Sequence, residues 1–309
     1  MEEDYPRTLL ELESRFGDEA ACRDYVYHLR WPSGFICPAC QGKAAWRLRN
    51  GLWQCRGCRR QVSVTAGTIF DTSHLPVKLW FRAMWHMTSQ KNGISALGLQ
   101  RALGLGSYKT AWAMLHKLRR AMVRPGRDRL SGRVEVDEVL WGGEEPGMRG
   151  SRETEKKAWV ILAVELKGEN MGRIRMKHIP NAARTHLHGF IHDSVEPGSI
   201  ICTDGLQAYR GLVDYQHERH IQEHQKPGVY VLPHVHRVVS LLKRWLLGTH
   251  QGAIAHAHLD DYLNEFTFRF NRRLSASRGK LFYRLVQQAV QVPPHPFAAI
   301  TTPPSIGGG

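Results

Sequence analysis

The segment Val134-Glu-Val-Asp-Glu-Val-Leu-Trp-Gly-Gly143 places the carboxylate of Asp137 inside an apolar, β-branched run. Such a run is typical of a buried strand, and the interior of a strand seldom carries Asp. A second run of this kind, Ile200-Ile-Cys-Thr-Asp-Gly205, ends on another carboxylate, Asp204. Because Asp-Gly is also a turn signal, two independent strand-end turns are an alternative explanation of the pair.

Carboxylates displayed from neighbouring strands can hold hard cations between them. Mg²⁺ and Mn²⁺ prefer oxygen ligands, and two such ions about 4 Å apart can activate a nucleophile and stabilise a leaving oxygen in phosphodiester chemistry. Asp137 and Asp204 are therefore candidate ligands for catalytic magnesium or manganese. Glu138 adjoins Asp137 but points to the other face of a strand, which favours a structural role for it.

The overall composition favours a nucleic-acid partner. The 309 residues suffice for two or three domains, and 43 Lys and Arg against 28 Asp and Glu give a formal net charge of +15. No apolar run approaches the length of a membrane span, no lipidation motif occurs, and the first thirty residues lack the apolar core of a signal peptide. We expect a cytoplasmic protein that associates with nucleic acid and has no membrane partner.

Four of the six cysteines are arranged as C-x2-C-x14-C-x2-C, namely Cys37, Cys40, Cys55 and Cys58. In a chain without export signals this spacing predicts a tetrahedral structural zinc site rather than disulfides. The intervening residues fit a hairpin that turns at Asn50-Gly51. We predict a zinc ribbon over residues 33–72. Cys22 and Cys202 are interpreted as buried apolar residues, with a catalytic thiol at Cys202 as an alternative.

Helical patterns flank the ribbon. Residues 1–32 predict two short helices, and residues 73–124 predict a helix-turn-helix-like region in which Gly104-Leu-Gly-Ser107 joins a short helix to a longer one. A basic outer face on the second helix can enter a major groove or lie along phosphates. The residues predicted to form that face are Lys109, Lys117, Arg119 and Arg120. An ordinary helical hairpin with a solvated basic face is the alternative.

The pattern from residue 130 to residue 290 predicts a ribonuclease-H-like α/β domain. Three successive strands, a helix, a strand, a helix and a strand follow one another, and in that fold the first strand lies centrally with the fourth beside it. This order brings Asp137 and Asp204 together. Long helices are predicted at 234–248 and 256–271. The tail 291–309 is rich in Pro and Gly and is predicted to be disordered. The fold class is therefore multidomain α+β.

Several runs, in this order and spacing, resemble the DDE-class transposases of bacterial insertion sequences, in the branch with an N-terminal zinc ribbon. The resemblance extends over about residues 20–290. Besides the ribbon and the two carboxylate motifs, the matching runs are Thr65-Ala-Gly-Thr-Ile-Phe70, Leu242-Lys-Arg-Trp-Leu-Leu-Gly-Thr-His250 and Tyr262-Leu-Asn-Glu-Phe-Thr-Phe-Arg-Phe-Asn-Arg-Arg273.

The resemblance makes Asp137 and Asp204 the first two members of a metal-binding triad. Lys243 matches the lysine that follows the third member, but the position where complete triads have Glu is His236 here. Imidazole is a softer ligand that suits manganese better than magnesium. Three hypotheses follow: His236 is a working ligand, another acid such as Glu265 substitutes, or activity is lost.

Glu265 has a second interpretation, an ion pair with Arg269 at i+4 on the surface of its helix. The basic residues near the end of the chain are candidates for a phosphate track, or for a solvated helix face. They are Lys243, Arg244, Arg269, Arg272 and Arg273.

The resemblance implies an enzyme that binds insertion-sequence ends, nicks them with metal assistance and joins the freed 3′-hydroxyl to target DNA. It also implies a homo-oligomer on DNA, because two ends must be joined together. Two alternatives are a ribonuclease-H-like nuclease that cuts without strand transfer and a zinc-ribbon DNA-binding protein whose catalytic fold has decayed. The second is motivated by the missing Glu at position 236.

Overall fold

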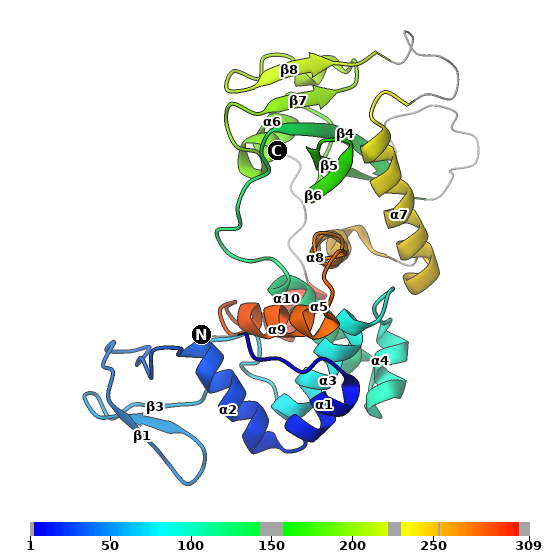
Figure 1. The fold of residues 1–309 in the computed structure, drawn as a ribbon. Coiled ribbons are helices and arrows are strands. Elements are labelled where there is room, and N and C mark those ends of the chain that lie inside the picture. Colours follow the sequence, from blue (N-terminus) through cyan, green and yellow to red (C-terminus); the bar gives the residue numbers. More distant parts are fainter. Residues whose placement is uncertain (1–2, 143–156, 222–229, 253, 303–309) are drawn as a thin grey trace. The chain divides into compact units, whose positions relative to one another are not determined.

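The computed structural model describes residues 3–142, 157–221, 230–252 and 254–302, and these form two compact units (Figure 1). The helical unit combines Met1–Pro125 with Leu274–Thr302, and the sheet unit is Gly126–Arg273. The boundary expected at residue 290 was therefore wrong. The helix after Arg273 buries its apolar face in the helical unit, as described below. No helix within the described ranges is both long and apolar enough to span a bilayer.

The helical unit begins with the two short helices that the sequence predicts, α1 (Leu9–Arg15) and α2 (Glu19–Arg30). Each starts at a residue whose side chain accepts a backbone hydrogen bond: Thr8 from the N–H of Glu11, and Asp18 from the N–H of Ala21. These caps satisfy amides that would otherwise lack partners, which explains why both helices begin where they do.

Three further helices follow the ribbon: α3 (Val77–Ser89), α4 (Ala96–Leu103) and α5 (Tyr108–Ala121). Gly104 ends α4 in the left-handed conformation, with φ of +62°, so the predicted short helix, glycine turn and longer helix are all present. Late in the sequence, α9 (Arg278–Ala289) packs against α3, and the fully buried ring of Phe282 lies 5.4 Å from that of Phe81. This contact places residues after 273 in the helical unit.

The segment predicted to be a disordered tail is partly folded. α10 (Phe297–Thr301) is a short helix in contact with α5, and Ile300 is buried at 2% exposure. The Pro-rich composition of 291–296 hides this short apolar anchor, because Phe297 to Ile300 is too brief to register as a periodic pattern. Residues 303–309 lie outside the described part of the chain.

The ribbon is a three-stranded antiparallel sheet of β1 (Ala45–Arg47), β2 (Trp53–Cys55) and β3 (Gln61–Val62). Its first turn holds Gly51 at a φ of +81°, as the Asn-Gly signal predicts. Trp53 stacks on Tyr27 of α2 with ring centroids 4.4 Å apart, and its ring also faces Phe35. These aromatic contacts fix the ribbon against α2.

The sheet unit contains five strands in the order β6-β5-β4-β7-β8. They are β4 (Arg133–Trp141), β5 (Ala158–Lys167), β6 (Asn170–Ile179), β7 (Ile200–Thr203) and β8 (Gln216–Arg219). β4, β5 and β6 pair antiparallel, whereas β7 runs parallel to both β4 and β8. The first strand is central and the fourth lies beside it, which confirms the ribonuclease-H-like order predicted from the sequence.

Helices cover both faces of this sheet. α6 (Arg184–Ser194) covers one face, and α7 (Pro233–His250) and α8 (Leu259–Phe270) cover the other (Figure 1). Where the predicted order calls for a second helix, after the fourth strand, the structure has only the single 3-10 turn Gln207–Tyr209. Gly211 then adopts a φ of +82°, which ends helical geometry there.

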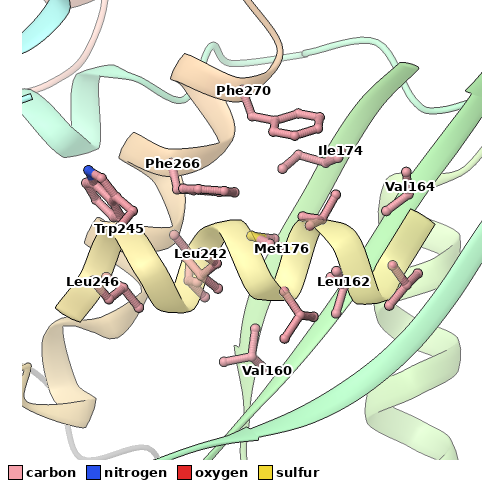
Figure 2. Packing of buried hydrophobic residues seen from close by; sticks show 14 of the residues in the cluster. Val160, Leu162, Val164, Ile174, Met176, Leu242, Trp245, Leu246, Phe266 and Phe270 are labelled. Atoms are coloured by element: carbon pink, nitrogen blue, oxygen red, sulfur yellow. The ribbon is translucent and has the colours of Figure 1, made fainter. Parts of the chain in front are cut away.

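Alternate residues of β5 serve the two cores. Val160, Leu162 and Val164 face α7 and α8, where Figure 2 shows them with Leu242. Ile161 faces the α6 side. A strand buried on both faces reads as a continuous apolar run, which explains why β5 lacks the alternation seen in β6.

The core under α7 supplies a stability test. Leu242→Ala, at a side chain only 2% exposed, should lower the free energy of unfolding of the sheet unit by about 2–5 kcal/mol, because it removes packed methyl groups and leaves a cavity. Leu247→Ala on the same helix, at 59% exposure, should change it by less than about 0.5 kcal/mol. Urea titrations measure both. Equal losses in the two variants would contradict this packing.

Candidate active site and zinc ribbon

One catalytic candidate, Asp137, lies on β4, and the other, Asp204, directly follows the adjacent parallel strand β7. The β4–β7 register pairs Val134 with Ile201 and Glu135 with Cys202. Continued by two residues, the same register sets Asp137 beside Asp204, which directly follows β7. The side chain of Asp137 belongs to the α7 side of the sheet, because residues two apart in a strand share a face and Val139 packs against the core on that side. The structure thus brings the pair together as the sequence predicts.

Negative charge accumulates around Asp137. Burial raises the pKa of its carboxyl to about 8, and the neighbouring carboxylates of Glu138, Asp204 and Glu135 add to the rise. Asp204 Oδ1 accepts a 2.9 Å hydrogen bond from the N–H of Leu206. Carboxylates that burial and mutual repulsion hold in this way are stabilised by a divalent cation, so the donor set fits magnesium or manganese.

Glu138 points away from this group. Its Oε2 accepts a 2.6 Å hydrogen bond from the O–H of Tyr209, a fully buried residue in the core on the α6 side. Burial and the adjacent carboxylate of Glu138 raise the pKa of the Tyr209 hydroxyl, so that it remains a hydrogen-bond donor. This contact agrees with the structural role expected for Glu138.

His236 lies in the first turn of α7, on the helix that packs over the face carrying Asp137. Burial lowers the pKa of its imidazole, although the charge of Glu135 opposes this, and the lowered pKa favours a neutral ring with a free lone pair for a metal. Its ring centroid is 4.5 Å from that of Tyr230. Lys243 follows seven residues later, two helical turns along, and is exposed.

Asp137, Asp204 and His236 do not form one of the tight groups found among the described residues, in which all ligand atoms lie within 4.8 Å of one another. Two ions about 4 Å apart spread their ligands over a wider span than one ion does.

Glu265 is engaged elsewhere. Its side chain is fully buried on α8, and its Oε1 lies 4.0 Å from Nη1 of Arg269, the i+4 partner that the sequence suggests. The ion pair is present, but it is buried rather than on the surface. The carboxylates that act on Asp137 are Glu138, Asp204 and Glu135, and Glu265 is not one of these three.

A second polar group lies along the same edge of the sheet. Cys202 Sγ and His220 Nε2 are 3.9 and 3.6 Å from Glu218 Oε2. The guanidinium of Arg133 donates two hydrogen bonds to this carboxylate, at 2.5 and 3.1 Å. Arg133 therefore neutralises Glu218. Burial raises the pKa of the Cys202 thiol to about 11, which leaves it protonated and argues against a nucleophilic role.

The ribbon cysteines form a tight four-sulfur group, as predicted. Their ligand atoms all lie within 4.8 Å of one another, and Sγ–Sγ distances are 3.6 Å for Cys37–Cys58 and 3.5 Å for Cys40–Cys55. The backbone N–H of Cys40 lowers the pKa of Cys37 to about 6, and the N–H of Cys58 lowers that of Cys55. Thiolates held by backbone amides in this way suit tetrahedral zinc.

Comparison with known proteins matches both regions. Residues 129–271 match the ISXO2-like transposase domain, and residues 17–61 match the transposase zinc-ribbon domain. The chain belongs to the insertion-sequence transposases with a zinc ribbon. It is also 28% identical over 284 residues to an uncharacterized protein in transposable element ISH50 of Halobacterium salinarum, with 82% of this chain and 91% of that protein covered.

The basic residues that the sequence placed on one face of α5 in this transposase are divided. Lys109 and Arg120 are exposed, whereas Lys117 and Arg119 are buried at 7% and 1% exposure. The expectation of a continuous basic face was wrong, because α3, α4, α9 and α10 all contact α5 and leave little of it free. Burial also lowers the pKa of Lys117.

Two arginines of the expected phosphate track make contacts within the sheet unit. Arg272 lies 3.9 Å from the ring centroid of Phe268. Arg273 donates hydrogen bonds to the carbonyls of Gly172, at 3.1 Å, and Met171. The Arg273 contacts join the end of α8 to β6, whereas the Arg272 contact lies within the α8 segment itself. Lys243 and Arg244 on α7 are exposed and better placed for phosphates.

Sequence reasoning missed Glu135 and His234. Glu135 is buried, and its carboxylate receives three hydrogen bonds from the start of α7. The signal for it was present: an acid two residues before Asp137 lies on the same face of the strand. His234 carried no such signal, because its contact depends on a helix packing that no local pattern reveals.

Zinc content should depend on the ribbon cysteines alone. Cys37→Ser should abolish bound zinc and disturb the stacking of Trp53 on Tyr27, because the knuckle that orders the hairpin is lost. Metal analysis and tryptophan fluorescence measure the two effects. Cys202→Ser is the matched control and should retain zinc. Equal zinc in Cys37→Ser and wild type would refute the site.

Manganese binding at the carboxylates should strengthen as pH rises toward about 8. Below that pH Asp137 carries a proton in the metal-free protein, and a cation must displace it. The apparent affinity should rise about tenfold per pH unit below the pKa of Asp137 and level off above it. Titrations followed by the electron paramagnetic resonance of free Mn²⁺ measure this. In Asp137→Asn the slope should vanish; an unchanged slope there would assign the proton to another group.

Proposed function

We propose that this transposase binds the ends of an insertion sequence and catalyses divalent-metal-dependent strand cleavage followed by strand transfer. The carrying observation is the β4–β7 register, which, continued by two residues, sets Asp137 beside Asp204 just past the end of β7, within the segment matched by the transposase domain. The similar protein from Halobacterium salinarum is named for a transposable element, which supports a mobile-element role.

The residues that would hold the catalytic ions are Asp137, Asp204 and His236. Bound magnesium or manganese would supply Lewis-acid activation of water or of a 3′-hydroxyl and charge stabilisation of the leaving oxygen. Asp137 gives up its proton when a cation binds, and His236 offers a neutral imidazole lone pair. With two carboxylates and one imidazole, we expect manganese to support activity better than magnesium.

Lys243 and Arg244 are proposed to contact the DNA backbone beside the cleaved bond. Both are exposed on α7, and Lys243 lies on the same side of the helix as His236 because seven residues complete about two turns. An ammonium there would neutralise phosphate charge as the strand is positioned. On this proposal the zinc ribbon and the α4–α5 pair recognise the inverted repeats, with Lys109 and Arg120 as the exposed bases of α5.

A homo-oligomer on DNA completes the proposal, since joining two ends requires two active sites. The second candidate function is a DNA-binding protein without catalysis, and one observation favours it: a neutral His at position 236 removes one negative charge from the metal site. A nuclease that cuts without transfer is distinguished from both by its products.

Cleavage and strand transfer on DNA carrying the element's own ends test the proposal. Wild type should form both products in Mn²⁺. Asp204→Asn should reduce them at least about a thousandfold, and His236→Ala by about 10–100-fold, because each removes a proposed metal ligand. His236→Glu should raise activity in Mg²⁺ relative to Mn²⁺, since it restores a hard oxygen ligand.

His186→Ala is the matched control, because His186 lies on α6, on the opposite face of the sheet, and contacts Asn181. Its products should match those of wild type. Wild-type protein that binds the ends yet remains inert in both metals would establish the non-catalytic candidate. Cleavage without joined products would establish the nuclease.

A further inference from the structure

Glu135 occupies an unusual place for a carboxylate. It is 5% exposed, within the central strand β4, and two residues before Asp137 on the same face. Burying an ionised carboxylate costs free energy unless hydrogen bonds or charges compensate it. Among the described residues, the hydrogen bonds to its carboxylate come from the first turn of α7.

Three donors of α7 converge on Glu135. The backbone N–H groups of His234 and Val235 each donate to Oε2 at 3.0 Å, and Nδ1 of His234 lies 2.7 Å from Oε1. The residue preceding α7, Leu232, provides no side-chain cap, and the helix starts with Pro233. Glu135 therefore serves as the N-cap of α7 from another element, at the helix end where the dipole favours negative charge.

His234 extends the link to a third element. Its Nε2 lies 3.2 Å from the carbonyl oxygen of Glu169, in the turn between β5 and β6. One carboxylate and one imidazole thus tie β4, the start of α7 and this turn together. His236 is in the same helical turn, and the charge of Glu135 acts on both His236 and Asp137.

We propose that Glu135 and His234 form a positioning pair that sets His236 of α7 against Asp137 of β4, and so determines how tightly the site holds divalent metal. Glu135 does not ligate the ions, because its oxygens are occupied by α7. It fixes the separation of two ligands carried by different elements, and it adds negative charge to a site that has His in place of an acid. The inference rests on the proposed function, which makes Asp137 and His236 ligands.

Binding of Mn²⁺ to the full-length protein, followed by electron paramagnetic resonance at one pH, tests the pair without any assay of activity. Glu135→Gln should weaken binding by about 10–100-fold, the usual effect of removing a partner that orients a metal ligand. His234→Ala should weaken it similarly. Hydrogen exchange at the amides of His234 and Val235 should accelerate in Glu135→Gln, because the cap is weakened.

Glu165→Gln is the matched control. Glu165 is also a buried carboxylate of this sheet, at 3% exposure, but it accepts from Arg173 and the N–H of Ser131 rather than from α7. This variant should lose stability and keep the wild-type affinity for Mn²⁺. Thermal melts of every variant separate unfolding from altered binding.

A double-mutant cycle separates positioning from general stabilisation. If Glu135 acts through His236, then Glu135→Gln should weaken Mn²⁺ binding far less in a His236→Ala background than in wild type. Additive losses would overturn the inference, as would wild-type affinity in folded Glu135→Gln. If wild type shows no Mn²⁺ binding that Asp204→Asn weakens, the proposed function fails and the inference fails with it. Mn²⁺ binding that depends on Asp204 but not on Glu135 would overturn the inference and leave the proposed function standing.

Discussion

Parallel pairing of β4 with β7 is the constraint on which the rest of the sheet unit depends. A parallel pair advances both strands together, so a carboxylate in the middle of β4 meets a carboxylate just past the end of β7. A slip of one residue in this register would turn one of the two carboxylates to the α6 face of the sheet, and the pair would be separated. The apolar residues of β4 and β7 are divided between the two cores, so a slip would move each of them to the wrong core and is disfavoured.

The acidic face created by that pairing is costly without a counterion. Burial and repulsion together raise the pKa of Asp137 to about 8, so this carboxyl retains a proton at neutral pH. The N-terminal amides of α7 offset part of this negative charge, because they donate hydrogen bonds to Glu135. The first turn of α7 also carries His236, whose lowered pKa favours a neutral ring. The charge of Glu135 therefore acts both on the position of α7 and on the imidazole of His236.

Much of this architecture could be predicted from local patterns. The cysteine spacing, the glycine that ends α4 and the apolar runs of β4, β5 and β7 each carry a local physical signal, and all appear where they were expected. The burial of Lys117 and Arg119 could not be predicted, because basic side chains on a helix look alike whether two or four neighbours surround it.

The same limit applies to Glu135 and to the domain boundary. The partner of Glu135 lies about a hundred residues away on a helix, so no window of sequence contains both. α9 reads as one more amphipathic helix after α8, and nothing in its own residues tells which unit its apolar face will join. Long-range packing decided every point at which local patterns failed.

The helical unit is built from both ends of the chain, with the sheet unit encoded between them. A ribosome therefore releases all of β4 to α8 before the residues that fill the gap beside α3, including Phe282, have emerged. Until then the helix-turn-helix-like pair stands on an incomplete core. A nascent or prematurely terminated chain can consequently contain a complete sheet unit while the core of its helical unit still lacks α9.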